Sequence, residues 1–373
     1  MPKVPALDEL QQRRSEKWFG YGDGVIAATV AEMDFELAEP IAAVLHDAVS
    51  RSDLGYTAGV PASLGEAFAG FARRRLDWQV DPDQLALVPD VMLGLIELCR
   101  IVAPGGSVGF ASAAYPPFLL QLPPAGFSLV PIPLAADGSF DLDRLVAQLR
   151  DGLDVLILAN PHNPTGRVLP REELEQIADL CAQYGAWVFA DEIHAPLVLP
   201  GGAKHVPWLE VSDAARSCGI SLTSASKAFN LAGLKAAMMV TASDRAQDVV
   251  RRSSIASEQA GLLGVLAAEV AFSQCDDWLD DVLRQLDRNR TVIDTGLPAG
   301  VSWTPPQATY VGWLDFAGAL DEDPARFLLS KAGVALSPGT SYDPAATTFA
   351  RLNFGTSEEL VTEMLNRIAT GLG

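Results

Sequence analysis

Short apolar runs alternate with helical patterns through the middle of this 373-residue chain, and this alternation constrains the fold more than any other feature. The runs are rich in branched aliphatic residues and are typical of buried strands, whereas stretches such as 92–102 and 172–184 are typical of helices. Strands that alternate with helices predict an α/β fold with a mostly parallel sheet covered by helices on both faces. Seven strands are expected: Ala86–Val88, Ser107–Phe110, Ser128–Ile132, Val155–Ala159, Trp187–Ala190, Ile220–Thr223 and Ala236–Val240.

Polar residues follow three of these expected strands near the point where each strand ends. Asn163, Asp191 and Lys227 each come shortly after a different apolar run. In open α/β sheets, ligands bind outside the carboxyl ends of the strands. The sequence therefore predicts that these three side chains meet in one crevice.

The segment from Ser224 to Lys235 carries the most specific chemical pattern. Hydroxyls stand three and one positions before Lys227, and a second lysine, Lys235, follows eight positions later. A lysine that forms an imine with an aldehyde must lose its proton, and burial near another cation lowers a lysine pKa. Serine hydroxyls and a second lysine can bind phosphate oxygens. The pattern suits a phosphorylated aldehyde cofactor, and a surface lysine on a serine-rich turn is the alternative.

The order and spacing of these motifs resemble a known family. Asn163 and Asp191 are 28 positions apart, Asp191 and Lys227 are 36 apart, and Arg351 follows near the C-terminus. Over nearly the whole chain, this ordered set resembles the fold-type I pyridoxal-phosphate enzymes of the class I/II aminotransferase superfamily. Within it, the chain is most similar to the cystathionine β-lyase branch of C–S lyases, which includes a maltose-regulon modulator protein. The segments that carry this similarity are Lys17-Trp18, Val30–Phe35, Gly55–Thr57, Tyr115–Phe118, Asp191–His194 and Asn230–Lys235.

The resemblance implies a site for pyridoxal 5′-phosphate around one lysine. Lys227 would hold the cofactor as an imine and, once the substrate amine displaces it, move the Cα proton. Asp191 would pair with the pyridine nitrogen, which must stay protonated for the ring to accept electrons. Asn163 and His194 would donate to the ring oxygen, and Tyr115 would stack on the ring. Each has an ordinary alternative: a strand-end carboxylate, a turn asparagine, a structural histidine and a core tyrosine.

The resemblance also assigns residues to the phosphate and to the substrate. Ser224, Lys235 and the backbone N–H groups of Val91 and Met92, at an expected helix start, would bind the phosphate. Arg351, with Asn163 beside it, would bind the substrate carboxylate in a forked pair, and a surface arginine is the alternative. Tyr56 resembles a catalytic tyrosine that reaches the phosphate of the partner subunit, so the resemblance implies a homodimer with shared active sites.

Two residues depart from the family pattern. Asp90 stands just before Val91, where a glycine usually opens the phosphate loop. A carboxylate beside a phosphate is unfavourable unless it faces away or caps the helix, so the backbone geometry at 90–92 is open. Glu32 replaces the usual aspartate of this branch, which would change the substrate-side wall.

The two ends of the chain are expected to form a second domain by analogy with the family. The prediction is a large cofactor-binding domain at 46–284 and a smaller α+β domain made of 1–45 and 285–373. A long helical stretch should run over 258–290, with an interruption at Cys275–Trp278. Beyond it we expect a strand at Tyr310–Phe316, a helix at Pro324–Ala332 and a C-terminal helix capped by Ser357.

Composition excludes several other classes of protein. The formal net charge of −20 argues against a nucleic-acid-binding surface, and no apolar run is long enough for a membrane span. The four cysteines are scattered and should be buried free thiols in a reducing compartment, so the protein is expected to be cytoplasmic. The four histidines form no zinc pattern, and no metal site is predicted.

The motifs leave more than one reaction open. The similarity to the lyase branch favours β-elimination on cystathionine or another cysteine S-conjugate, giving a thiol, pyruvate and ammonia. Aminotransfer would use the same cofactor contacts, and a decarboxylating deamination of a sulfur conjugate is a further variant. A regulatory protein that retains the cofactor is a third class, although no helix-turn-helix segment precedes the enzyme-like region. The sequence does not name the thiol-bearing group.

Overall fold

The central sheet has the predicted seven strands. The structure is a computed structural model that describes residues 2–135, 138–201, 203–255 and 257–373. The strands are β2 (Leu85–Val88), β3 (Ser107–Ser112), β4 (Ser128–Pro133), β5 (Val155–Ala159), β6 (Trp187–Asp191), β7 (Gly219–Thr223) and β8 (Ala237–Val240). Their order is β2-β8-β7-β6-β5-β3-β4. Only the pairs that include β8 are antiparallel, so the mostly parallel sheet is confirmed.

Helices cover both faces of this sheet, because successive strand side chains point to opposite sides. On β5, Val155 and Ile157 pack in one apolar cluster, whereas Leu156 and Leu158 pack in the other. The first cluster includes side chains of α4 (Val91–Val102), α5 (Pro116–Gln121) and α10 (Asp244–Arg251). The second includes side chains of α3 (Ala62–Phe71), α6 (Leu142–Arg150), α7 (Arg171–Tyr184), α8 (Asp213–Cys218) and α11 (Leu262–Gln274).

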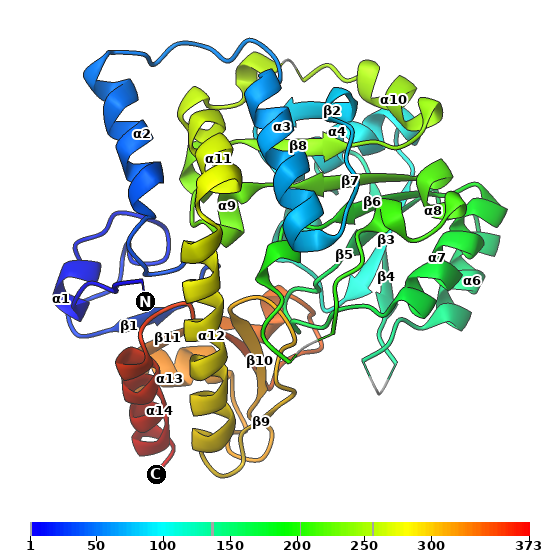
Figure 1. Cartoon of the computed structure of the whole chain (residues 1–373). Coiled ribbons are helices and arrows are strands. Elements are labelled where there is room, and N and C mark those ends of the chain that lie inside the picture. Colours follow the sequence, from blue (N-terminus) through cyan, green and yellow to red (C-terminus); the bar gives the residue numbers. More distant parts are fainter. Residues whose placement is uncertain (1, 136–137, 202, 256) are drawn as a thin grey trace.

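A second, five-stranded sheet joins the N-terminal segment to the C-terminal part of the chain (Figure 1). The strands are β1 (Ile26–Ala28), β9 (Ser302–Trp303), β10 (Val311–Asp315), β11 (Val334–Pro338) and β12 (Phe349–Asn353), in the order β1-β11-β12-β10-β9. β1 runs parallel to β11, and the other neighbours are antiparallel. This pairing places the residues just after β1 beside Arg351 of β12.

The C-terminal elements follow the prediction closely. The strand predicted at 310–316 is β10, and the helix predicted at Pro324–Ala332 is α13 (Pro324–Ala332). The last helix is α14 (Glu358–Leu372), and the hydroxyl of Ser357 accepts a hydrogen bond from the N–H of Leu360 at 3.2 Å. The helical stretch predicted at 258–290 is divided at Cys275 into α11 and α12 (Asp276–Gly296).

The division into domains at residues 45 and 284 stays a prediction, and its second boundary falls inside α12. The sequence interpretation did not identify β1, β9, β11 and β12. Because these strands are short and sparsely patterned, their pairing with distant partners defines them more than their own residues do. The remaining helices are α1 (Leu7–Leu10), α2 (Glu39–Ser50) and α9 (Ala225–Ala228).

The cysteines and the helices agree with two expectations from composition. Cys99, Cys181, Cys218 and Cys275 are all buried free thiols. Burial raises the pKa of the Cys99 thiol to about 12, so it stays protonated at neutral pH. Within the described ranges, no helix has the length and apolar character needed to cross a membrane.

Candidate active site

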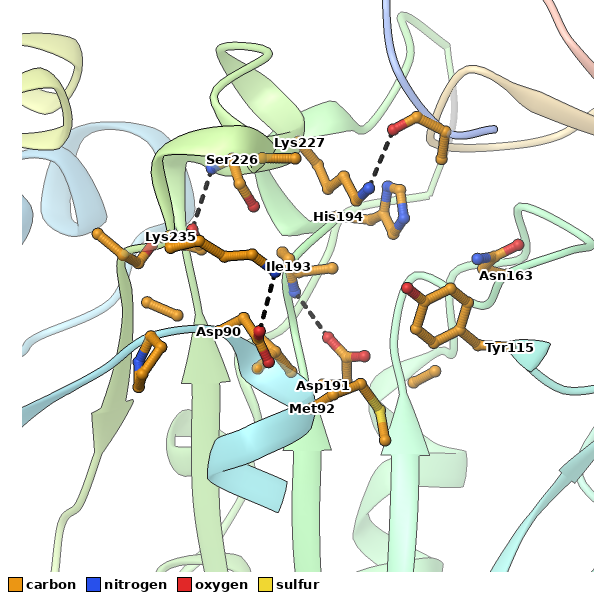
Figure 2. Close-up of a pocket in the computed structure, with 18 of the residues that line it drawn as sticks. Asp90, Met92, Tyr115, Asn163, Asp191, Ile193, His194, Ser226, Lys227 and Lys235 are labelled. Carbon is orange, nitrogen blue, oxygen red and sulfur yellow. Dashed lines mark hydrogen bonds and ion pairs between the residues drawn. The ribbon is translucent and has the colours of Figure 1, made fainter. Parts of the chain in front are cut away.

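One cavity of about 200 Å³ opens at the carboxyl ends of β5, β6 and β7. It contains the predicted convergence of Asn163, Asp191 and Lys227, which come from three neighbouring strand ends (Figure 2). Nine of the eleven predicted site residues line this cavity: Val91, Met92, Tyr115, Asn163, Asp191, His194, Ser224, Lys227 and Lys235. Arg351 lies just behind the wall and Tyr56 lies elsewhere.

Lys227 sits on the short helix α9, directly after β7, and its amine reaches across to the N-terminal segment. Its Nζ donates a hydrogen bond to the main-chain oxygen of Ala31 at 2.9 Å, and that oxygen also accepts from the Tyr310 hydroxyl at 2.9 Å. Burial, reinforced by the charge of Arg351, lowers the pKa of Lys227 to about 8. About a tenth of the protein therefore carries a neutral amine here at pH 7.

Asp191 ends β6 and faces the same cavity from the floor. Burial raises its pKa to about 6, although the N–H of Ile193, 3.2 Å from Oδ1, and the charge of Lys227 act in the opposite direction. The carboxyl group is thus ionised at neutral pH, and it forms no ion pair with any residue that the structure describes. A buried carboxylate of this kind is suited to a protonated ring nitrogen.

Arg351 connects the second sheet to the cavity. One guanidinium nitrogen donates to Oδ1 of Asn163 at 3.0 Å, and another donates to the main-chain oxygen of Thr29 at 2.8 Å. Its charge also lies 5.1 Å from the ring of Tyr342. Arg351 is only 3% exposed, and its Nε has no hydrogen-bond partner in the described part of the chain. A buried guanidinium with spare donors is suited to a carboxylate ligand.

The first turn of α4 and the start of α9 form the opposite end of the cavity. Asp90 caps α4, since its Oδ1 accepts from the N–H of Leu93 at 2.8 Å, and its Oδ2 lies 3.1 Å from Nζ of Lys235. The hydroxyl of Ser224 donates to the main-chain oxygen of Ala236 at 2.6 Å and caps α9 through the N–H of Ser226. The helix start expected at Val91 is confirmed, and Asp90 takes the capping position left open by the sequence.

His194 and Tyr115 complete the walls as neutral groups. Burial lowers the pKa of His194 to about 3, and its Nδ1 has no hydrogen-bond partner among the described residues. Burial raises the pKa of Tyr115 to about 12. The Tyr115 ring meets Phe118 edge-on at 5.6 Å.

Tyr56 is not part of this cavity. Its side chain is 87% exposed, and its main chain forms an isolated bridge with Gly261. Two contributors to the site were missed from the sequence: Tyr310 and the main-chain oxygen of Ala31. Ser226, whose hydroxyl the sequence marked as a possible phosphate ligand, also lines the cavity. No local sequence pattern indicates Tyr310 or the oxygen of Ala31, because both reach the site from distant segments of the chain.

The fold and the site together define a class of protein: an α/β protein with an amine of lowered pKa and a carboxylate facing one crevice at the carboxyl ends of parallel strands. The family model for aminotransferase class I and II matches residues 25–368. The chain belongs to this family, and the family assignment predicted from the sequence is confirmed.

Similar proteins cover the whole chain. A cystathionine β-lyase of Corynebacterium glutamicum is 34% identical, over 99% of this chain and 100% of that protein. A crystal structure from Corynebacterium diphtheriae, described as a candidate PLP-dependent β-cystathionase, is 33% identical and has a TM-score of 0.93, covering 100% of this chain and 99% of that one. The PLP-bound C–S lyase from Staphylococcus hominis is 25% identical with a TM-score of 0.89, covering 99% and 97%.

Proposed function

We propose that the protein is a pyridoxal 5′-phosphate-dependent C–S β-lyase that acts on cysteine S-conjugates. The observation that carries this proposal is the pairing of Lys227, an amine with a pKa of about 8, with the buried carboxylate of Asp191 in one cavity. The cystathionine β-lyase of Corynebacterium glutamicum and the C–S lyase of Staphylococcus hominis support the choice of reaction within the family.

The donors in the cavity fit the cofactor. Pyridoxal phosphate, when bound, supplies an aldehyde that condenses with amines and a protonated ring that accepts the electron pair released at the substrate Cα. Asp191 would hold the proton on the ring nitrogen, and the amide N–H groups of Asn163 would face the ring oxygen. His194, whose Nδ1 lacks a partner among the described residues, is available for the same oxygen. Tyr115 would cover the ring face.

Lys227 would act first as the anchor and then as the base. Its neutral fraction at pH 7 would allow it to hold the cofactor's aldehyde, and a substrate amine that took its place would leave the lysine amine free inside the cavity. The free amine would remove the proton from the substrate Cα and would return a proton to the leaving sulfur. The main-chain oxygen of Ala31, which holds Nζ at 2.9 Å, orients the amine.

The remaining contacts would fix the two anionic ends. Ser224, Lys235 and the N–H groups of Val91 and Met92 would bind the phosphate. Arg351 would bind the substrate α-carboxylate through the nitrogens that now contact Thr29 and Asn163.

We also propose a homodimer that completes each site. Tyr56 supports this, because a tyrosine that is 87% exposed and does not line its own cavity is available to a second copy of the chain. The buried thiols of the four cysteines support a reducing, cytoplasmic location.

The reaction converts a cysteine S-conjugate and water into a thiol, pyruvate and ammonia. The test supplies cystathionine and a set of S-alkyl-cysteines to the protein loaded with pyridoxal phosphate, and it measures thiol and pyruvate together. Equal amounts of thiol and pyruvate are expected. If neither product forms from any conjugate, the proposed reaction is wrong.

Aminotransfer is the second candidate, and the family to which the chain belongs favours it. The two reactions differ in the fate of the substrate: aminotransfer leaves the C–S bond intact and yields a keto acid and the amine form of the cofactor. The same incubation distinguishes them, because an aminotransferase would release no thiol. Release of carbon dioxide would instead indicate the decarboxylating variant.

A further inference from the structure

We propose that Asp90 limits the affinity of this site for its phosphorylated cofactor, by competing with the phosphate for Lys235 and for the first turn of α4. The inference rests on the proposed function, since it concerns the same phosphate end. It makes the occupancy of the site depend on the supply of free cofactor.

The contacts of Asp90 place its charge where an anion is expected to bind. One carboxylate oxygen accepts from the N–H of Leu93 at 2.8 Å, and the other lies 3.1 Å from Nζ of Lys235 (Figure 2). The N–H groups at a helix start and a nearby lysine are the two features that attract a phosphate. In this chain, the carboxylate of Asp90 already engages the lysine and one N–H of that first turn, that of Leu93, next to the N–H groups of Val91 and Met92.

The other charged side chains that line the cavity do not compensate for Asp90. Among the described residues that line it, the charged side chains are Asp90, Asp191, Lys227 and Lys235. Asp191 and Lys227 belong to the ring end, so Lys235 is the one cation left for the phosphate end. Asp90 neutralises it. A phosphate dianion therefore meets no net positive charge from the side chains that line this end.

The alternative is that Asp90 is only a helix cap. Asparagine caps a helix about as well as aspartate but carries no charge. The variant Asp90→Asn therefore keeps the cap and removes the competition. Asp141→Asn is a matched control, because Asp141 caps α6 in the same way, accepting from the N–H of Arg144 at 3.0 Å away from the cavity.

The experiment titrates apoprotein with pyridoxal phosphate and with pyridoxal, which lacks the phosphate, and follows binding by absorbance and by thermal shift. For Asp90→Asn, we expect the Kd of pyridoxal phosphate to fall about tenfold, because Lys235 is released from the carboxylate and a charge that repels the phosphate is removed. The Kd of pyridoxal should stay unchanged. Asp141→Asn should match the wild type for both ligands.

Further arms separate failure of this inference from failure of the proposed function. Inorganic phosphate should stabilise Asp90→Asn apoprotein against heat at lower concentrations than it does the wild type. In the background of Lys235→Met, the effect of Asp90→Asn should shrink.

If wild-type protein binds pyridoxal phosphate and Asp90→Asn binds it equally tightly, the inference is overturned while the proposed function stands. If neither pyridoxal phosphate nor pyridoxal binds, the proposed function fails. Asp90→Ser, which also caps, replaces Asp90→Asn should the latter not fold.

Discussion

Replacing Lys227 by methionine should make the apoprotein more stable at neutral pH. Burial lowers the pKa of Lys227 from 10.5 to about 8, so the folded protein holds this proton less tightly than the unfolded chain does. A depressed lysine pKa leaves stability unaffected above pH 10.5, reduces it as the pH falls to 8, and leaves a constant cost below pH 8. Methionine fills a similar volume without the charge and removes that cost.

The size of the effect follows from the two pKa values. The buried charge of Lys227 costs about 3 kcal/mol at pH 7 and about 1 kcal/mol at pH 9.5, and partial exposure of the side chain makes these upper figures. The lost hydrogen bond to Ala31 offsets about 1 kcal/mol. The oxygen of Ala31 keeps its bond from the Tyr310 hydroxyl at 2.9 Å, so no acceptor is left unsatisfied.

Urea denaturation of the apoprotein at pH 7 and pH 9.5 measures this difference. Lys227→Met should exceed the wild type in free energy of unfolding by about 2 kcal/mol at pH 7, and the excess should nearly vanish at pH 9.5. Lys3→Met, at an exposed lysine, is the control and should match the wild type at both values. A variant that is no more stable at pH 7, or an excess that does not depend on pH, would refute the reasoning.

Three other substitutions give distinct outcomes. Arg351→Lys should lower kcat/KM for cysteine S-conjugates about 10- to 100-fold by loss of the forked contact, and an unchanged value would remove Arg351 from substrate binding. Glu32→Gln should lower the pKa of Lys227 further, because the Glu32 charge raises it; the pH dependence of amine modification in the apoprotein reports this, and an unmoved midpoint contradicts it. Asp191→Asn should stabilise the apoprotein at pH 7.5 more than at pH 5. The wild-type carboxyl group has a pKa raised to about 6, so its ionisation with rising pH lowers the free energy of unfolding of the wild type. A difference in urea midpoint between variant and wild type that is the same at both pH values would count against this.

The convergence of the strand-end residues could be predicted from the sequence because parallel strands bring their carboxyl ends to one edge. Asn163, Asp191 and Lys227 therefore needed only their strands to be identified. The contact between Lys227 and the oxygen of Ala31 could not be predicted, since it joins residues 196 positions apart through the pairing of β1 with β11. Every residue carries a main-chain oxygen, so the residue types do not indicate which of these oxygens contacts a side chain.

Asp90 shows how a departure from a motif is resolved by local geometry. The sequence indicated a carboxylate near the expected phosphate and left its orientation open. The structure places it as the cap of α4 and the partner of Lys235, which explains why the helix tolerates it. Tyr56 is the opposite case, because the role predicted for it concerns a second copy of the chain, and within one chain its side chain is 87% exposed.

The central claim is that Lys227 is the residue that carries the cofactor. Borohydride reduction of the protein incubated with pyridoxal phosphate, followed by proteolysis and mass spectrometry, tests it directly. The account predicts that the reduced cofactor is found on the peptide that contains Lys227 and that Lys227→Met carries none. Labelling at another lysine, or no labelled peptide at all, would contradict it.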